Sequence, residues 1–331
     1  MHTDIQNNLI MTNKSIKGKD GYVDVVIVTY NSEEFISRCL ETLLRDNERI
    51  GKIVIIDNSS CDGTVRAIKL FDCVELIELK DNAGFSRASN LGFKKTVSEY
   101  VMFLNPDCYA DEKAVSNLLN RAVLSDSDCI IGPCLLNADL SLQFSARSFH
   151  SLTTQFSESF FLSILFPKSE LFGRYFQRYK DYNKEFESDW ITGAVMLMPR
   201  KLFVKVGFFD ERFFMFEEDV DLCYRARKLG YRVIYYPGSK FMHCDAGSFG
   251  KDEEYRRLKM VYSSRLKYYC KHMNKLVALI FSMLVRIGFT NRFLIYLISG
   301  LVSGKDKRSI RLNRMRTFFK LIFARLGDEV G

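Results

Sequence analysis

The sequence lacks the residue patterns of several common sites. None of its nine cysteines stands in a CxxC pair and only four histidines are present, so a structural zinc site is not expected. The glycine patterns GxGxxG and GxxxxGK(S/T) are absent, which argues against a dinucleotide-binding fold and a P-loop ATPase. Residues 1–21 contain no sustained apolar stretch, so we expect a loose tail and no export signal there. The odd number of cysteines then indicates a reducing compartment without a disulfide framework.

The chain has the composition of a globular protein, with 331 residues, 47% hydrophobic and 27% charged. Its charge is distributed unevenly. Residues 1–250 carry 30 Lys and Arg against 34 Asp and Glu, whereas residues 251–331 carry 18 against 6. A strongly basic last quarter attached to a mildly acidic body suggests an anionic partner for that segment.

The first half of the chain alternates short apolar runs with amphipathic helix patterns. The runs lie at residues 23–28, 52–57, 74–79, 100–104 and 128–132. Ser32 is placed to cap the helix after the first run, and Asp62 to open the next helix. A regular strand–helix order predicts an α/β fold with a mostly parallel sheet and right-handed crossovers.

Polar residues follow each of the first four predicted strands. They are Thr29-Tyr30-Asn31, Asp57-Asn58-Ser59, Asp81-Asn82-Ala83-Gly84 and Asn105-Pro106-Asp107. Each of them alone is compatible with an ordinary turn. Ligands in parallel sheets bind beyond the carboxyl ends of the strands, so the four together predict a binding site.

Two acidic positions have alternative interpretations. Asp107 follows a buried strand, where a carboxylate either caps a turn or holds a cation. The run Glu217-Glu218-Asp219 follows a group of aromatic residues, which predicts partial burial and at least one raised pKa. Such a cluster provides a general base, or it is simply an acidic first turn favoured by the helix dipole.

The second half is less regular. Residues 133–188 are rich in aromatic side chains without a clear period, which suggests a long, partly helical insert. The run WITGAVMLM (190–198) predicts a strand, and a short helix follows it and ends at Gly207. A helix over about 218–229 ends at Gly230, and residues 232–236 predict another strand.

Six motifs, in order, resemble glycosyltransferase family 2, and most of all the bacterial rhamnosyltransferases of surface polysaccharide synthesis. They are VIVTYN, IIDNSSCDGT, DNAGFSRASN, FLNPD, WITGAVMLMPR and FFMFEEDVDLCYRARKLGY, spread over roughly residues 22–250. The resemblance implies the GT-A fold, a mostly parallel central sheet flanked by helices. It also implies a nucleotide-binding half at about 22–132 and an acceptor-binding half at about 133–250.

By this resemblance Asp107 binds a divalent metal, Mg²⁺ or Mn²⁺, on the diphosphate of a nucleotide-sugar donor. The sequence departs from the family's D-x-D motif, because Asn105 replaces the first carboxylate and is expected to contact the ribose or a metal-bound water. Asp57 is expected to accept a pyrimidine N–H, which fits thymine or uracil, unless it only stabilises its own turn. The other expected donor-binding residues are Thr29, Tyr30, Asn31, Asn82, Gly84 and Arg87; Gly84 is also compatible with a plain helix-entry glycine.

For the transfer itself, the resemblance assigns the acid pair to Glu218 and Asp219. An inverting transfer needs a base for the acceptor hydroxyl; we assign Asp219 to that role and Glu218 to orienting the acceptor. Glu217, Trp190 and Gly193 are expected on the acceptor side, although Trp190 is equally suited to filling the core.

His243 is predicted to be a further metal ligand or a diphosphate contact. A lone histidine is more often structural, and that alternative remains open.

The basic last quarter predicts three helical segments. The first runs from about Tyr255 to Met273, with Arg265 and Lys271 among the residues of a charged face. Two apolar stretches, 276–285 and 293–302, are each about half the ~20 residues that span a bilayer and are bounded by Arg286 and Arg292. A basic amphipathic pattern follows, typical of helices in the interface of an anionic membrane. The alternative is a helical dimer interface, so a homo-oligomer remains open.

The sequence therefore predicts an inverting, metal-dependent glycosyltransferase with a helical basic C-terminal extension. We expect it to move L-rhamnose from dTDP-rhamnose to a polyprenyl-diphosphate-linked saccharide in cell-surface (O-antigen-like) polysaccharide synthesis. It would act at the cytoplasmic face of the membrane. No nucleic-acid partner is expected, because the basic segment lacks a reading module. The alternatives are a UDP-hexose donor, or a non-catalytic nucleotide- or sugar-binding scaffold, against which Asp107 and Asp219 argue.

Overall fold

The computed structural model describes residues 21–125, 129–244, 254–301 and 305–327, the last without the side chains of 305–307. The expected N-terminal tail lies outside the described residues except for Gly21, and so does the expected domain boundary near residue 250. The chain forms two compact units, each built from separate stretches of sequence. The sheet unit contains 1–146, 182–211 and 222–248, and the helical unit contains 147–181, 212–221 and 249–331.

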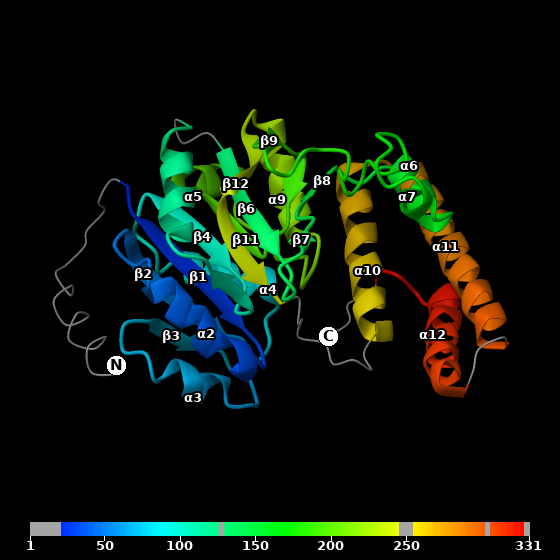
Figure 1. The fold of residues 1–331 in the computed structure, drawn as a ribbon, viewed down its shortest axis with the longest axis horizontal. Coiled ribbons are helices and arrows are strands. Elements are labelled where there is room, and N and C mark those ends of the chain that lie inside the picture. Colours follow the sequence, from blue (N-terminus) through cyan, green and yellow to red (C-terminus); the bar gives the residue numbers. More distant parts are fainter. Residues whose placement is uncertain (1–20, 126–128, 245–253, 302–304, 328–331) are drawn as a thin grey trace. The chain divides into compact units, whose positions relative to one another are not determined.

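The sheet unit is built on a ten-stranded mixed sheet with the main order β3-β2-β1-β4-β11-β6-β12-β5 (Figure 1). The main strands are β1 Val23–Thr29, β2 Ile50–Asp57, β3 Glu75–Glu78, β4 Tyr100–Leu104, β5 Cys108–Ala110, β6 Cys129–Leu136, β11 Val195–Pro199 and β12 Arg232–His243. Short strands β7 Leu142–Gln143 and β9 Phe186–Glu187 pair with β6 and β12, and β8 Ala146–Arg147 pairs with β10 Trp190–Ile191.

The first four strands are parallel, as the strand–helix order predicts. Strand β11 lies antiparallel between β4 and β6, whereas β6 and β12 are parallel to each other. The expected α/β architecture with a mostly parallel sheet and flanking helices is confirmed. The sequence did not indicate that β11 separates β4 from β6.

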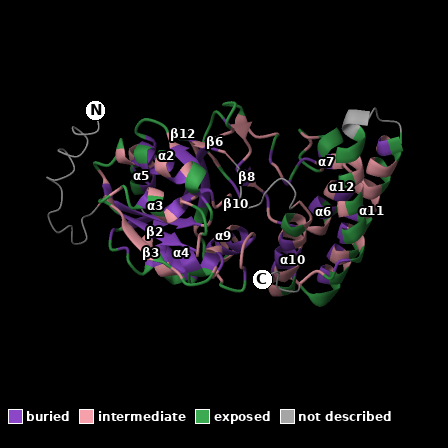
Figure 2. Cartoon of the chain, turned by 90° about the horizontal axis from the view of Figure 1, so that it is seen from below, coloured by how far each residue is buried: buried purple, intermediate pink, exposed green. Residues whose placement is uncertain are grey.

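Helices cover both faces of this sheet (Figures 1 and 2). Helices α2 Glu33–Leu44 and α5 Ala114–Val123 bury Leu40, Leu43 and Leu118 against alternate residues of β1 such as Val25. Helix α4 Phe85–Phe93 packs on the opposite face with α8 Arg200–Val206, and their aromatic rings meet at Phe93–Phe203, 4.8 Å between centroids. Since neighbouring residues of β1 point to opposite faces, both faces of this apolar strand are buried.

Two local expectations are corrected. Ser32 stands at the N-cap of α2 but its side chain does not cap the helix; Asp62 Oδ2 accepts the hydrogen bond from Glu33 N at 3.1 Å. Asp62 also accepts from Thr64 N at the start of α3 Thr64–Ile68, so it serves two helices. The expected strand WITGAVMLM is broken into β10 and β11 by a turn that contains Gly193.

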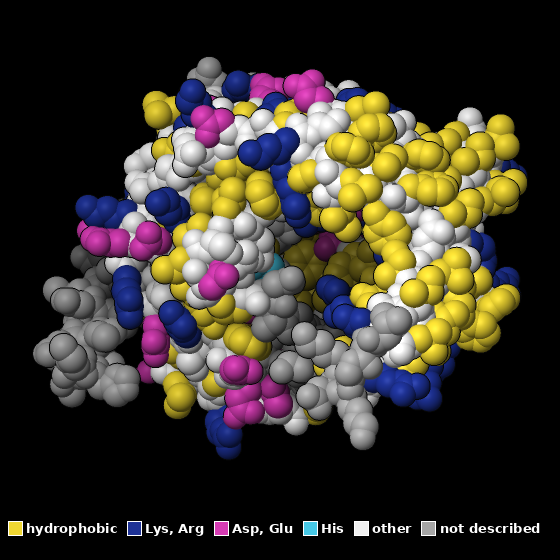
Figure 3. Space-filling view, turned by 45° about the vertical axis from the view of Figure 1, so that its right-hand side comes forward, with side chains coloured by type: hydrophobic (Ala, Val, Ile, Leu, Met, Phe, Trp, Pro, Cys, Tyr) yellow, Lys and Arg dark blue, Asp and Glu magenta, His cyan; other side chains and the backbone are white. Residues whose placement is uncertain are grey.

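The helical unit contains α6 Leu152–Ser159, α7 Leu162–Leu165, α10 Glu254–His272, α11 Lys275–Leu301 and α12 Lys305–Phe323. The two expected apolar stretches form one continuous helix, α11, which packs on α6, α10 and α12. By length and composition α11 is the one described helix that could cross a membrane, with a mean hydropathy of 1.5. Figure 3 shows hydrophobic side chains spread widely over the surface of these helices.

Candidate active site

The polar ends of the first three strands of the sheet unit are joined by hydrogen bonds. Thr29 Oγ1 donates to Asp57 Oδ1 at 2.9 Å, which links the ends of β1 and β2. Asn58 Oδ1 accepts from Ala83 N at 2.9 Å, which links β2 to the loop after β3. The structure thus brings together the strand ends in which the sequence predicts a binding site.

Asp57 is almost fully buried and closes its own turn. Ser60 donates to it twice, from Oγ to Oδ1 at 2.6 Å and from N to Oδ2 at 2.9 Å. With Thr29 this makes three hydrogen bonds, and a carboxylate has about four acceptor positions. The turn-stabilising role is therefore present, and it occupies three of these positions.

The other expected donor-binding residues line the same strand ends. Tyr30 is half-buried, while Asn31 is exposed and accepts from Cys61 N at 2.9 Å. Asn82 Oδ1 accepts from Gly84 N at 3.0 Å. Gly84 has φ +82° at the N-cap of α4, a conformation that favours glycine, and Arg87 is exposed on that helix.

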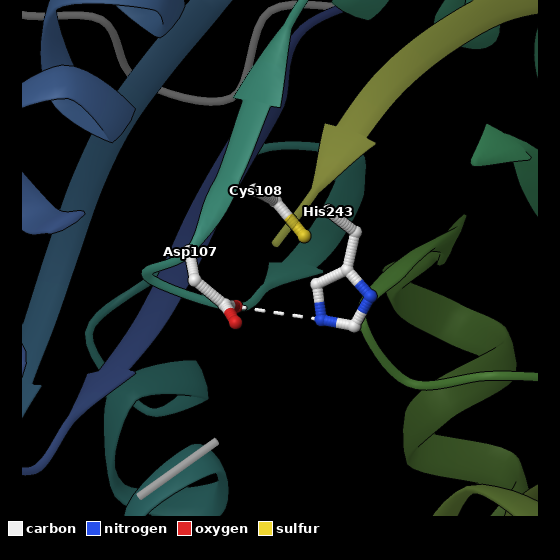
Figure 4. A group of neighbouring side chains, drawn as sticks. All are labelled: Asp107, Cys108 and His243. Carbon is white, nitrogen blue, oxygen red and sulfur yellow. Dashed lines mark ion pairs between the residues drawn. The ribbon is translucent and has the colours of Figure 1, made fainter. Parts of the chain in front are cut away.

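Asp107 and His243 come together although 136 positions separate them in the numbering. Strand β12 is longer than expected and runs on to His243, which lies opposite Cys108 in the antiparallel pair with β5. The carboxylate of Asp107, 6% exposed, approaches the ring of His243, with 3.4 Å between Oδ1 and Nε2 (Figure 4). The predicted metal position is thus a two-residue pair at the edge of β5 and β12.

Gln143 sets the orientation of the His243 ring. Its amide Nε2 donates to Asn137 Oδ1 at 3.0 Å, so its Oε1 must face His243 Nδ1, which lies 2.7 Å away. Nδ1 therefore carries the hydrogen. When the ring holds a single proton, Nε2 presents a lone pair toward Asp107.

Two acceptor atoms that face each other at this distance fit a cation between them. A histidine held through its other nitrogen by a protein acceptor is the usual arrangement at metal sites. Cys108 is close enough to join such a cluster, with its ligand atom and those of Asp107 and His243 all within 4.8 Å. Its thiol, however, donates to Ala194 O at 3.4 Å, and a hard cation prefers oxygen ligands. The geometry suits Mg²⁺ or Mn²⁺ on Asp107 and His243, with Asn105 half-buried in the same turn.

The acidic cluster lies at the start of α9 Glu218–Lys228 and in the turn just before it. Its three residues belong to the helical unit, which contains residues 212–221. Phe216 and Glu217 have φ of +66° and +68°, which side-chain-bearing residues rarely adopt. Glu217 and Glu218 are buried, and Asp219 is half-buried. A strained turn of this kind persists only where its surroundings hold it in place.

Glu217 is held by two buried cationic or hydrogen-bonding groups. His150 Nε2 lies 2.5 Å from Glu217 Oε2, and Arg265 Nε donates to Oε1 at 3.0 Å. Burial by itself would raise the pKa of Glu217, but His150 and Arg265 outweigh it and hold the pKa at about 2. Burial lowers the pKa of His150, so it serves as a neutral N–H donor at neutral pH. Glu217 is therefore an ionised anchor.

The pKa of Glu218 is shifted in the opposite direction to that of Glu217. Burial, and then the neighbouring Asp219, raise its pKa well above the ordinary value. Its Oε2 is buried and has no hydrogen-bond partner among the described residues. The pair thus consists of a buried carboxyl that favours the protonated form and a half-buried Asp219 that a ligand can approach more easily.

Helix α10 also contacts Asp221, which lies in the first turn of α9. Asp221 is fully buried and contacts Lys271 Nζ and His272 Nε2, the latter at 2.7 Å. Through Arg265 and these two residues, α10 contacts both Glu217 and Asp221. Sequence analysis assigned Arg265 and Lys271 to a charged face and missed Gln143 and His150. The one sequence signal that could have pointed to His150 is the small number of histidines in the chain.

The expected acceptor-side residues outside this cluster lie in the sheet unit. Trp190 is 5% exposed, and its carbonyl accepts from Ser188 Oγ at 3.0 Å. This burial agrees with the core-filling alternative. Gly193, in the turn between β10 and β11, is half-buried.

Comparison with known proteins gives consistent results. The family model of glycosyl transferase family 2 matches residues 24–207, and that of glycosyl transferase family group 2 matches residues 150–324. An N-acetylglucosaminyl-diphospho-decaprenol L-rhamnosyltransferase of Mycobacterium tuberculosis is 30% identical over 240 residues, which is 69% of this chain and 78% of that protein. The rhamnosyltransferase WbbL of Escherichia coli K12 is 27% identical over 67% of this chain and 83% of its own length.

Solved structures support the fold. The mannosyltransferase PcManGT from Pyrobaculum calidifontis, solved with GDP-Man and Mn²⁺, has a TM-score of 0.54 at 12% identity, covering 97% of this chain and 94% of that one. GalNAc-T7, solved with UDP, GalNAc and Mn²⁺, has a TM-score of 0.52 at 15% identity, covering 78% and 54%. These similarities confirm the expected GT-A-like fold.

Proposed function

Because this chain belongs to glycosyl transferase family 2 and is a glycosyltransferase, we propose that it transfers L-rhamnose from dTDP-rhamnose by an inverting, metal-dependent mechanism. The acceptor is a saccharide on polyprenyl diphosphate. The observation that carries the metal-dependent part is the Asp107–His243 pair, in which a carboxylate oxygen and an imidazole lone pair face each other at 3.4 Å. The rhamnosyl part is supported by the two rhamnosyltransferase relatives.

The donor is held at the strand ends of the sheet unit. Asp107 and His243 would hold Mg²⁺ or Mn²⁺ there, and a cation bound by them would supply compensation for the negative charge of the leaving diphosphate. Asp57 uses its remaining acceptor position for the N–H of the pyrimidine. The surrounding residues wall the base or contact the ribose and diphosphate; they are Thr29, Tyr30, Asn31, Asn82, Gly84, Arg87 and Asn105.

Asp219 acts as the general base that takes the proton from the acceptor hydroxyl. Its half-buried position and the raised pKa of Glu218 support this choice, because a carboxyl that favours the protonated form is a poor acceptor for that proton. In the protonated form Glu218 orients the acceptor by donating a hydrogen bond. Glu217, bound to His150 and Arg265, contributes to the acceptor side by holding the turn in place.

Trp190 and Gly193 belong to the acceptor side by resemblance to the family. The burial of Trp190 limits its part to supporting that side from the core. The enzyme works at the cytoplasmic face of the cell membrane in surface polysaccharide synthesis, where its basic segment 251–331 meets anionic lipid.

A donor panel tests the proposal. The purified full-length protein is incubated with dTDP-rhamnose, UDP-glucose and UDP-N-acetylglucosamine, each with Mn²⁺ and with a chelator, and release of nucleoside diphosphate is measured. We expect metal-dependent release from dTDP-rhamnose above all others. Preferred release from a UDP-hexose would refute the donor, and equal release with chelator would refute the metal. Binding of a nucleotide or sugar without release from any donor would leave the scaffold alternative.

A further inference from the structure

The helical unit exposes an unusual number of large apolar side chains from two separate stretches of the chain. We call them the apolar face. On α11 they are Leu276, Leu279, Met283, Ile287, Leu294, Ile295, Ile298 and Leu301, and in the α6–α7 region they are Phe156, Phe160, Ile164, Leu165, Phe166 and Leu171. Their exposed fractions range from 39% to 68%. Exposed apolar side chains clustered in this way mark a surface that contacts a membrane or another protein.

The two stretches adjoin each other. Asn291 Nδ2 of α11 donates to Ser159 O at the end of α6 at 3.0 Å, and Ser159 Oγ donates to Leu284 O at 2.8 Å. Most of the α11 members recur every three or four residues, so they lie along one side of the helix. The surface in Figure 3 shows the hydrophobic side chains of these helices as a broad expanse with Lys and Arg at its edges.

The polar side of α11 is turned into the unit. Arg286 donates to the carbonyl oxygens of Ile322 and Ala324 at the end of α12, and Arg292 Nη2 donates to Glu158 O of α6 at 3.2 Å. These bonds fasten α11 sideways onto its neighbours. A helix fastened in this way exposes one apolar side, which suits lying in a membrane interface better than crossing the bilayer alone.

The positive charge next to the apolar face indicates what this face contacts. Residues 307–327 contain seven Lys and Arg and no Asp or Glu, and Arg308, Arg314 and Arg316 are exposed on α12 beside α11. Anionic lipid headgroups complement this charge. A second copy of the chain would instead bring two basic α12 helices together and is opposed by their repulsion.

We propose that the apolar face rests in the headgroup–acyl boundary of an anionic membrane, with α11 lying along the surface and the α7 turn inserted beside it. This inference deepens the proposed function by naming the surface that meets the lipid on which the acceptor is carried. It also places residues 156–171, outside the basic segment, in the membrane contact.

Vesicle flotation tests the contact. Full-length protein is floated with vesicles of phosphatidylcholine alone and of phosphatidylcholine mixed with phosphatidylglycerol. The variants are Ile164→Asp/Leu165→Asp in α7 and Leu279→Asp/Met283→Asp in α11. The matched control is Leu70→Asp, because Leu70 is 77% exposed but belongs to the sheet unit.

We expect the wild type to float with the anionic vesicles and less so at high salt. Each double variant should partition at least about tenfold more weakly, since burying one such side chain contributes about 1.5–3 kcal/mol. Leu70→Asp should float like the wild type. Flotation unchanged in both double variants, or absent in the wild type, overturns the proposal. So does a wild-type dimer that both double variants convert to monomers.

Hydrogen exchange on the wild type gives a second test that does not depend on any variant folding. We expect vesicles to slow amide exchange over residues 160–171, and no such slowing overturns the proposal. Neither readout involves sugar transfer. A protein that floats but does not transfer refutes the proposed function alone, and one that transfers to a soluble acceptor but does not float refutes only this inference.

Discussion

Replacing Arg265 by Met is predicted to destabilise the protein strongly. The guanidinium donates to Glu217 Oε1 at 3.0 Å, to Glu158 Oε2 at 3.1 Å and to the Tyr175 hydroxyl at 3.3 Å. Its side chain is 9% exposed and that of Glu217 is 5% exposed. Met has a similar length but no charge, so the substitution leaves the Glu217 carboxylate buried with His150 as its remaining hydrogen-bond partner among the described residues.

The ion pair and the lowered pKa of Glu217 both indicate a large loss of stability. Removing one partner of a buried ion pair costs about 3–5 kcal/mol of unfolding free energy, because the other charge stays buried without compensation. The pKa of Glu217 falls from an ordinary 4.5 to about 2 through His150 and Arg265 together, a shift worth about 3 kcal/mol at neutral pH, of which Arg265 supplies a part. We therefore expect a loss of about 3–5 kcal/mol for Arg265→Met at pH 7.

The pH dependence has a definite sign. A carboxyl with a lowered folded pKa stabilises the protein above its ordinary pKa, and the effect is lost as the pH falls from 4.5 toward 2. Without Arg265, burial is opposed by less positive charge, so the pKa of Glu217 rises in the variant. At low pH the Glu217 carboxylate is then protonated and no longer needs a positive partner. The loss of unfolding free energy caused by Arg265→Met should therefore become smaller below pH 4.5.

Urea unfolding followed by circular dichroism at pH 7 and pH 4 measures these differences. Arg66→Met is the control, because Arg66 makes an exposed ion pair with Glu33 at 3.2 Å and should cost less than about 1 kcal/mol. Adding Glu217→Gln to Arg265→Met should cost less than the sum of the single changes. The reasoning fails if Arg265→Met costs no more than the control, or if its cost grows on acidification.

Further predictions concern the donor and acceptor sites. Asp107→Asn should abolish metal-dependent turnover, and a variant that keeps a normal Mn²⁺ saturation curve would exclude Asp107 as the metal anchor. Gln143→Leu should weaken Mn²⁺ binding by about 10–100-fold through the freed His243 ring, and an unchanged metal Kd would contradict this. Asp57→Ala should weaken dTDP binding, measured by calorimetry, far more than acceptor affinity; equal effects would reject contact with the base. Asp219→Asn should lower kcat about 10²–10⁴-fold with donor Kd unchanged, whereas Glu218→Gln should act mainly on acceptor KM. If Glu218→Gln is the inactive variant instead, the assignment of the base is wrong.

Sequence alone determined the first four strands of the sheet and the polar residues at their carboxyl ends, because both depend on local patterns. Apolar runs such as 23–28 and 100–104 can bury both faces only inside a covered sheet, and they do so in β1 and β4. Parallel strands place their carboxyl ends at one edge, so the polar residues after them had to meet. The hydrogen bond of Thr29 with Asp57 is the result.

Tertiary structure alone decided which distant residues complete each cluster. His150 and Arg265 reach Glu217 across 67 and 48 positions, and Gln143 reaches His243 across 100. The hydrophobic periodicity of the sequence does not indicate such pairings, because a buried charge pairs with whichever residue the fold places next to it. Arg265 has the sequence pattern of a solvent-facing cation on an amphipathic helix, and it is buried because the packing of α10 places the carboxylates of Glu217 and Glu158 against it. In a low-dielectric interior the ionised carboxylate of Glu217 requires that partner.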